Sequence, residues 1–270
     1  MNQNPQSKVV IITGASSGIG AATARRLARD RMRLTLAARR LERLESVAAE
    51  VESLGGQALI VQTDVRQYAD LQRMAQATLD RWGRIDVLLN NAGVGHDGPL
   101  VDLKPGRIRD EIHINLIAVI EATHIVLPIM LRQGAGQIVN VASLAGLIAT
   151  PNSSIYSATK FAVNGFTDSL RRELAGSGVR FSAFCPGFTP SEISPTLKAH
   201  YEGQPDAPRV MGLMPTTYVA DQIARLIHHP RRRVVVPRSW GVLVIVAFLF
   251  PGLADALINR FVPSKQRIEG

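Results

Sequence analysis

Short apolar runs rich in Val, Ile and Leu alternate along this chain with longer stretches in which apolar residues recur every three or four positions. Runs of the first kind predict strands, and stretches of the second kind predict amphipathic helices. The predicted strands cover residues 9–13, 34–38, 58–62, 86–90, 137–142, 179–185 and 233–237. The predicted helices cover residues 18–30, 41–54, 68–82, 108–131, 156–175 and 217–228.

This alternation predicts βαβ units, and therefore a parallel sheet with helices on both faces. We expect an α/β fold of the Rossmann type, a doubly wound sheet in a single domain, with ligands at the carboxyl ends of the strands. A length of 270 residues and a hydrophobic content of 46% suit one folded domain and exclude a disordered chain. Residues 8–237 form the predicted domain, residues 1–7 a disordered polar tail, and residues 238–270 an apolar extension.

A glycine-rich segment, Thr13-Gly14-Ala15-Ser16-Ser17-Gly18-Ile19-Gly20, follows the first predicted strand. Glycines permit a tight turn and a close approach of the backbone to a pyrophosphate, whose oxygens the free N–H groups of the next helix bind. Ordinary turns also use glycine, but the position between a strand and a helix favours a dinucleotide site. The candidate residues are Gly14, Ser16, Ser17, Gly18, Ile19 and Gly20.

Further motifs stand at the ends of later predicted elements. In chain order they are Asp64-Val65, Asn90-Asn91-Ala92-Gly93, Asn115, Ser143, Tyr156-Ser157-Ala158-Thr159-Lys160 and Pro186-Gly187. With the glycine spacing, they make residues 8–237 resemble the short-chain dehydrogenase/reductase family. The resemblance implies hydride transfer between a nicotinamide cofactor and a carbonyl or secondary alcohol. It also implies a catalytic set of Asn115, Ser143, Tyr156 and Lys160, and cofactor contacts from Asp64, Val65, Asn91, Ala92, Gly93, Tyr156, Lys160, Pro186 and Gly187.

The residue types of the catalytic set suit this chemistry. Tyr156 and Lys160 are four positions apart and share one helix face, although such pairs are also common on exposed helices. A phenol with a pKa of about 10 is a poor acid–base group at neutral pH, and a nearby ammonium lowers that pKa. Ser143 can donate a hydrogen bond to the substrate oxygen or cap a turn. By resemblance, Asn115 anchors a water that relays protons to Lys160; a core amide without function would look the same.

The end of the second predicted strand indicates the cofactor. A carboxylate here accepts from the ribose 2′-hydroxyl of NAD, whereas NADP needs a cation. The sequence reads Ala38-Arg39-Arg40, so the acid is missing and Arg39, with help from Arg40, can pair with a 2′-phosphate. We therefore expect NADP(H), with two merely exposed arginines as the alternative.

Two segments depart from the family pattern. Many relatives carry a threonine five positions beyond the proline of Pro186-Gly187, where this chain has Ser191; either Thr189 or Ser191 can contact the nicotinamide amide. Residues 191–214 are expected to form a substrate lid. Residues 241–254 carry no charge, and these fourteen residues are fewer than the roughly 20 that a spanning helix needs. Burial in a subunit interface or over the active site is one interpretation, and peripheral membrane contact is the other.

Composition limits the partners. The net charge of +9 comes from scattered basic residues, and aromatic residues make up only 5% of the chain, so no nucleic-acid partner is expected. The single cysteine, Cys185, excludes an internal disulfide, and the N-terminus lacks an apolar leader. These features favour a cytoplasmic protein, with the inner membrane surface as the alternative location. No cluster of His, Cys and carboxylate residues predicts a metal site.

We therefore expect an NADP(H)-dependent oxidoreductase that acts on a small hydrophobic carbonyl or alcohol, with Tyr156 as acid and base. A dimeric or tetrameric homo-oligomer is expected. The alternative is a membrane-associated dehydrogenase or reductase of lipid-like alcohols or ketones, such as steroids, retinoids or long-chain compounds. A cofactor-binding regulator without turnover is disfavoured, because the chain retains both Tyr156 and Lys160.

Overall fold

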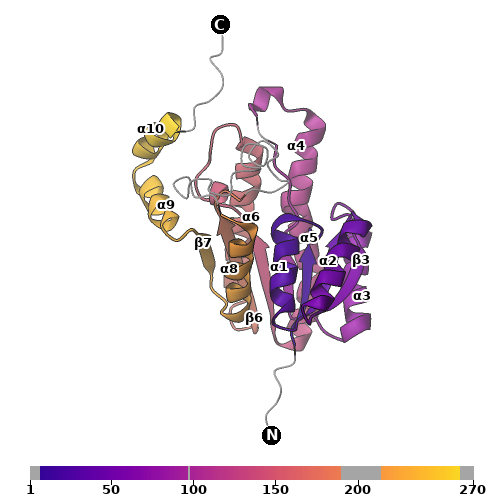
Figure 1. Ribbon diagram of the computed structural model, residues 1–270. Coiled ribbons are helices and arrows are strands. Elements are labelled where there is room, and N and C mark those ends of the chain that lie inside the picture. Colours follow the sequence, from indigo (N-terminus) through magenta and orange to yellow (C-terminus); the bar gives the residue numbers. More distant parts are fainter. Residues whose placement is uncertain (1–6, 97, 190–213, 262–270) are drawn as a thin grey trace.

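The computed structural model describes residues 7–96, 98–189 and 214–261, with the backbone alone at 259–261. Residues 1–6 of the expected tail and 191–213 of the expected lid lie outside the described residues. The strands are β1 Val9–Thr13, β2 Arg33–Ala38, β3 Gln57–Gln62, β4 Val87–Asn90, β5 Gly136–Val141, β6 Val179–Pro186 and β7 Arg233–Val236 (Figure 1). The helices are α1 Gly18–Ala28, α2 Leu41–Ser53, α3 Tyr68–Trp82, α4 Pro105–Ile112, α5 Ala118–Gln133, α6 Ser154–Glu173, α8 Thr216–His228, α9 Trp240–Leu249 and α10 Pro251–Phe261. Short helical turns are η1 Leu100–Asp102, η2 His113–Ile117 and η3 Leu144–Gly146.

Within the described residues, all strands join one seven-stranded parallel sheet in the order β3-β2-β1-β4-β5-β6-β7. The predicted doubly wound α/β fold is therefore confirmed. The strand order reverses between β1 and β4, so the loops after these two strands diverge and leave a crevice at the carboxyl edge. The glycine-rich segment after β1 and the Asn91-Ala92-Gly93 segment after β4 both lie at this crevice.

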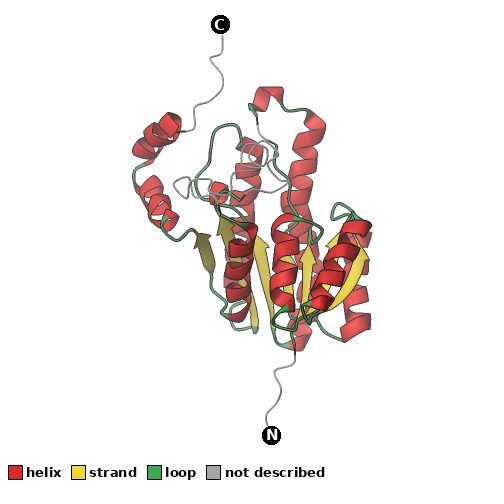
Figure 2. Cartoon of the chain, in the orientation of Figure 1, coloured by secondary structure: helices red, strands yellow, loops and turns green. Residues whose placement is uncertain are grey.

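Helices cover both faces of the sheet (Figure 2). Successive strand residues point to opposite faces, so Val10 and Ile12 pack into one apolar cluster and Ile11 into the other. The first cluster contains buried residues of α1, α2 and α8, and the second contains those of α3 and α5 together with partly buried residues of α6. Strands that are buried on both faces explain why the sequence shows continuous apolar runs rather than alternation.

The predicted helix 108–131 is part of a continuous helix, Pro105–Gln133, formed by α4, η2 and α5. By length and composition alone this helix could cross a membrane. Its residues Ala122, Val126 and Met130 are buried in the second apolar cluster with Leu88 and Ile138 of the sheet. These contacts identify it as a core helix of the fold.

The apolar C-terminal extension forms two helices, α9 and α10, that the sequence pattern did not predict. No residue of α9 is buried, and in Figure 1 the two helices stand away from the sheet as an arm beside its carboxyl edge. Because α9 is apolar on every side, its sequence shows no alternation of apolar and polar positions from which a helix could be predicted. The boundaries of the expected domain and extension stay predictions.

Candidate active site

The glycine-rich segment turns tightly between β1 and α1. Gly14 has a φ of +68°, a left-handed conformation that favours glycine. A Cβ at Gly20 would collide with the carbonyl oxygen of Gly14, so α1 can begin this close to the turn only with glycine there. The Thr13 hydroxyl accepts hydrogen bonds from the backbone N–H groups of Asn91 (3.0 Å) and Ala92 (3.1 Å), and so ties the loop after β4 to β1.

A cavity of about 280 Å³ lies over this turn. Nearly all predicted residues of the cofactor's adenosine and phosphate half line it: Gly14, Ser16, Ser17, Gly18, Ile19, Arg39, Arg40, Asp64, Val65, Asn91, Ala92 and Gly93. Gly20 does not line it and stands behind the turn, where it permits the packing just described. The cradle therefore fits a dinucleotide, because glycine backbone and the small side chains of Ser16 and Ser17 face an open space at a helix N-terminus.

The arginines after β2 lie at the edge of this cavity. The Arg40 guanidinium donates to the hydroxyls of Ser17 (2.7 Å) and Ser16 (3.2 Å), so it bridges to the glycine-rich turn. The preceding Ala38 is buried and offers no carboxylate. The nearest acid on the cavity wall, Asp64, is engaged by Arg66 at 2.7 Å, which holds the pKa of that carboxyl below its usual range.

Tyr156 and Lys160 lie on the first turns of α6, as their spacing predicts. The Lys160 Nζ lies 5.6 Å from the centroid of the Tyr156 ring and donates a hydrogen bond to the Val141 carbonyl at 2.9 Å. The amine is fully buried, and burial lowers its pKa from 10.5 to about 8. The nearby Glu111 opposes this shift because its charge favours the ammonium. A cation is thus held close to the phenol in a poorly solvated place.

Asn115 is buried within η2, a π-helical turn in the continuous helix. Its amide donates to the Val94 carbonyl (2.8 Å) and accepts from the Val94 N–H (2.9 Å). A Cβ placed on Gly93 would lie 3.3 Å from Asn115 Oδ1 and 3.7 Å from Lys160 Nζ, so both polar groups converge beneath that loop. Asn115 lines neither cavity, and single-turn π-helices are frequent at functional sites.

Ser143 lies two residues beyond the end of β5 and caps η3. Its hydroxyl accepts a hydrogen bond from the Ala145 N–H at 3.1 Å, so the capping role foreseen for this serine is present. The same side chain also lines the second cavity with Tyr156 and Lys160. A hydroxyl can accept one bond and donate another, so the two roles are compatible.

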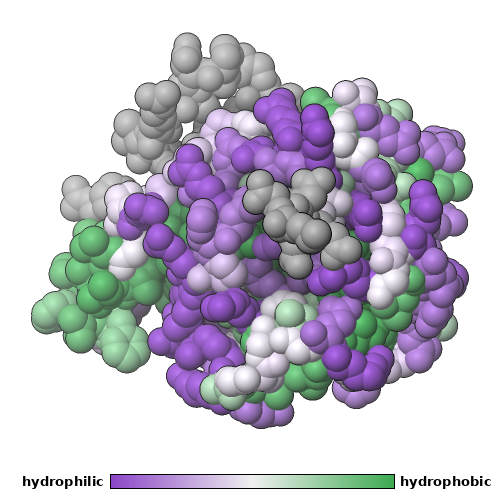
Figure 3. Space-filling view, turned by 90° about the horizontal axis from the view of Figure 1, so that it is seen from below, coloured by the Kyte–Doolittle hydropathy of each residue, from purple (hydrophilic) through white to green (hydrophobic). Residues whose placement is uncertain are grey.

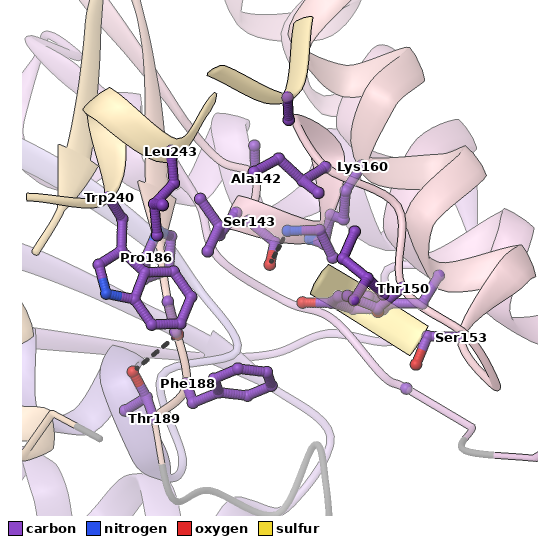
Figure 4. A pocket seen from close by; sticks show the side chains of 18 of the residues that line it. Ala142, Ser143, Thr150, Ser153, Lys160, Pro186, Phe188, Thr189, Trp240 and Leu243 are labelled. Carbon is purple, nitrogen blue, oxygen red and sulfur yellow. Dashed lines mark hydrogen bonds between the residues drawn. The ribbon is translucent and has the colours of Figure 1, made fainter. Parts of the chain in front are cut away.

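This second cavity, of about 460 Å³, adjoins the first and shares Ile19 and Asn91 with it. Pro186, Gly187 and Thr189 line it as predicted for the nicotinamide side, and the Thr189 hydroxyl donates to the Gly187 carbonyl at 3.4 Å. Figure 4 shows the Trp240 ring beside Phe188, with ring centroids 6.0 Å apart, across the cavity from Ser143 and Lys160. The alternative contact residue, Ser191, lies outside the described residues.

One interpretation of the charge-free run placed it over the active site, and the C-terminal arm does contribute a wall of this cavity, although the sequence did not predict which of its residues line it. Seven residues of α9 and α10 line the cavity: Trp240, Leu243, Val246, Ala247, Ala254, Leu257 and Ile258. The charge-free run 241–254 indicates apolar surroundings, but it does not by itself distinguish the active site from a subunit interface or a membrane surface. Nearby, His96 pairs through Nδ1 with the buried Glu111 (3.0 Å) and does not line the cavity. Among the described residues, no group of three or more His, Cys, Asp and Glu side chains is placed to hold a metal ion.

Residues 8–202 match a family model described as short chain dehydrogenase. The chain belongs to the short-chain dehydrogenase/reductase family. This confirms the resemblance that the motifs carry and the oxidoreductase class that the family implies. The roles of individual site residues remain predictions.

Curated relatives of the chain include reductases. It is 35% identical over 232 residues to the ketoacyl reductase HetN of Nostoc sp., covering 86% of this chain and 79% of that protein. It is 38% identical over 194 residues to a 3-oxoacyl-[acyl-carrier-protein] reductase of Synechocystis sp., covering 72% and 78%. A family member from Burkholderia phymatum, solved in complex with NAD, superposes with a TM-score of 0.81 at 31% identity, covering 92% and 95%. An actinorhodin polyketide ketoreductase variant with NADPH gives 0.77 at 31%, covering 85% and 95%. These neighbours support a nicotinamide cofactor for the family fold.

Proposed function

We propose that this protein is an NADP(H)-dependent oxidoreductase that interconverts a hydrophobic carbonyl compound and its secondary alcohol. One observation carries the proposal: Ser143, Tyr156 and Lys160 line one apolar cavity that adjoins the glycine-rich cradle. When bound, the nicotinamide supplies or accepts the hydride. Gly14, Ser16, Ser17 and Gly18 would hold the phosphates of the cofactor. Its nicotinamide end would lie against Pro186, Gly187 and Thr189.

In reduction, the Tyr156 hydroxyl donates a proton to the substrate oxygen. The buried ammonium of Lys160 favours the phenolate that remains, since an opposite charge nearby stabilises the ionised phenol. Ser143 donates a hydrogen bond to the same oxygen as negative charge develops there. Asn115 holds the loop at Val94 and stands close to Lys160, where the family pattern routes protons toward solvent. In alcohol oxidation the same groups act in reverse.

The preference for NADP(H) is proposed from the end of β2. Ala38 supplies no acceptor for a ribose 2′-hydroxyl, whereas Arg39 and Arg40 line the cavity. Arg40 reaches across to Ser16 and Ser17, so a cation stands between β2 and the phosphate turn. A phosphate bound there would gain charge-assisted hydrogen bonds. This supports a larger contribution of Arg40 to recognition of the 2′-phosphate than the sequence suggested.

The lining of the cavity supports a hydrophobic substrate, and two relatives named as ketoacyl and 3-oxoacyl reductases support a carbonyl on an acyl-type chain. A homo-oligomer is supported by exposed apolar residues on the outer faces of the long helix and α6: Ile117, Ile120 and Phe161. A cytoplasmic location is retained as part of the proposal. Size-exclusion chromatography with light scattering tests the assembly, and Ile120→Glu should shift it toward monomers.

The test of cofactor choice compares binding and turnover. Arg39→Ala and Arg40→Ala should each weaken NADPH binding by about 10- to 150-fold, the equivalent of one charge-assisted bond, and leave NADH binding nearly unchanged. Isothermal titration gives both dissociation constants, and kcat/KM with each cofactor on one ketone gives the kinetic counterpart. Adding Ala38→Asp should then favour NADH. Equal losses for both cofactors would show that the arginines bind no 2′-phosphate.

A further inference from the structure

The C-terminal arm exposes an unusual amount of apolar surface. Val242, Ile245 and Leu249 on α9 are 63%, 60% and 60% exposed, and Phe248 reaches 86%. Phe250, Leu253 and Leu257 continue this surface onto α10. Figure 3 shows the hydrophobic residues as a lobe that projects from a mainly hydrophilic body. Contiguous exposed apolar surface of this kind marks an interaction site.

The exposed residues do not form the narrow stripe that a helical partner would cover. At 100° per residue, Val242, Ile245 and Leu249 share one side of α9, whereas Leu243 lies about 100° away from Val242 and Phe248 about 120° away on the other side. Leu243, Val246 and Ala247 also line the cavity. The helix is thus apolar around its circumference, which is typical of a helix surrounded by protein core or by lipid.

Exposed basic residues lie at the start of the arm and elsewhere at the same end of the molecule. Arg238, exposed and two residues before α9, is followed by a helix with no charge. The α4 segment rises at the same end of the molecule (Figure 1) and is preceded by the exposed Leu100 and Val101 of η1. Its exposed basic residues are Lys104, Arg107 and Arg109. The exposed acidic residues of η1, α4 and the arm are Asp102, Asp110 and Asp255, and Asp110 already pairs with Arg66, while Glu111 of α4 is buried. Exposed apolar side chains flanked by basic residues complement an anionic lipid surface.

The length of the arm limits how it meets a bilayer. Ten residues of α9 span about 15 Å, and the chain then turns at Phe250–Pro251 into α10, which packs against α9. A hydrocarbon core is about 30 Å thick, so α9 reaches through one leaflet at most. The arm therefore suits insertion from one side.

We propose that α9 and α10 insert into one leaflet of an anionic membrane and that the active site takes a long-chain carbonyl or alcohol substrate from that leaflet. The substrate part rests on the proposed function. The same two helices expose apolar side chains outward and enclose the cavity inward, so an apolar chain can pass between lipid and Tyr156 without crossing water. The proposed NADP(H) cradle lies on the adjoining, less apolar cavity.

Vesicle flotation of the full chain tests the membrane part. Wild type should float with vesicles of equal phosphatidylcholine and phosphatidylglycerol, and about tenfold less with pure phosphatidylcholine at low salt. The double variant Ile245→Glu/Phe248→Glu should lose at least about tenfold of its flotation, because both side chains are exposed and outside the cavity lining. Leu131→Glu places a single added carboxylate on an exposed apolar site at the far end of α5 and should float like wild type, whereas the single variant Phe248→Glu, with the same added charge, should not.

Turnover separates the two proposals. With NADPH, the double variant should keep kcat/KM for butanone within about twofold and lose about tenfold for dodecanone carried in the anionic vesicles. Flotation without reduction of either ketone would overturn the proposed function and the substrate part, but leave the membrane surface standing. Butanone turnover with no flotation of wild type would overturn the membrane inference alone. The membrane inference would also be overturned if wild type is an oligomer and the double variant is a monomer, because the arm would then bind a second copy of the chain.

Discussion

Lys160 combines a catalytic position with a buried charge, and this predicts a conflict between activity and stability. We expect Lys160→Met to inactivate the enzyme and to raise the stability of the nucleotide-free protein at pH 7. Methionine has similar length and fills the same space without a charge. The stabilisation should come from the ammonium that no longer has to be desolvated, since burial is the main cause of the lowered pKa.

The size of the effect follows from the pKa. A change from 10.5 to about 8 corresponds to roughly 3 kcal/mol of cost for the charged form in the folded state. The hydrogen bond from Lys160 to the Val141 carbonyl offsets about 1 kcal/mol of this when it is removed. The variant should therefore gain about 2 kcal/mol at pH 7.

The sign of the pH dependence follows from proton counting. Below pH 8 the lysine is protonated in both states and the cost is complete. Between about pH 8 and 10.5 the unfolded chain holds the proton and the folded chain does not, so wild-type stability rises with pH relative to the variant. The variant's advantage of about 2 kcal/mol at pH 7 should fall by roughly 3 kcal/mol over this interval, so that wild type becomes the more stable protein by about 1 kcal/mol above pH 10.5.

Urea unfolding of both proteins at pH 7, 8, 9 and 10 measures this difference, with Tyr156→Phe as the control that keeps the lysine. A variant less stable than wild type at pH 7, or a difference that does not change with pH, would refute the reasoning. Activity alone cannot replace this measurement, because loss of turnover is also expected from losing the cation beside Tyr156.

Three further substitutions probe the site. Gly20→Ala should fold but weaken NADPH at least about tenfold in isothermal titration, because its Cβ would displace the carbonyl of Gly14; an unchanged dissociation constant would contradict the cradle. Asn115→Ala should lower the free energy of unfolding by about 2–3 kcal/mol in urea titrations, since both backbone groups of Val94 lose a partner, and a loss below 0.5 kcal/mol would speak against it. Ser143→Ala should reduce kcat about 10²- to 10³-fold while NADPH affinity in fluorescence titration stays the same, and equal losses in both would make it a structural residue only.

The sequence predicted the sheet and most of the site because these depend on local order. Strand and helix ranges agreed to within a few residues, since buried strands and amphipathic helices leave distinct patterns. The spacing of Tyr156 and Lys160 on one helix placed them together directly. The glycine-rich turn was similarly readable, because Gly14 needs a left-handed conformation wherever such a turn occurs.

Other parts of the site depend on contacts between distant residues, which a single sequence does not encode visibly. Nothing local shows that Arg40 reaches Ser17, or that His96 pairs with Glu111. The packing of Trp240 on Phe188 is likewise set by how the arm folds back after β7. The helix α9 escaped prediction because a segment that is apolar on every side has no period.

The proposed function is tested most directly by the kinetics of wild type and Tyr156→Phe with one hydrophobic ketone, using NADPH and NADH in turn. We predict that wild type oxidises NADPH in the presence of the ketone with a kcat/KM at least about tenfold above that for NADH. Tyr156→Phe should bind NADPH as wild type does and lose nearly all turnover, because only the proton-donating hydroxyl is removed. A variant that retains the wild-type kcat, or a wild type that prefers NADH, would contradict the account.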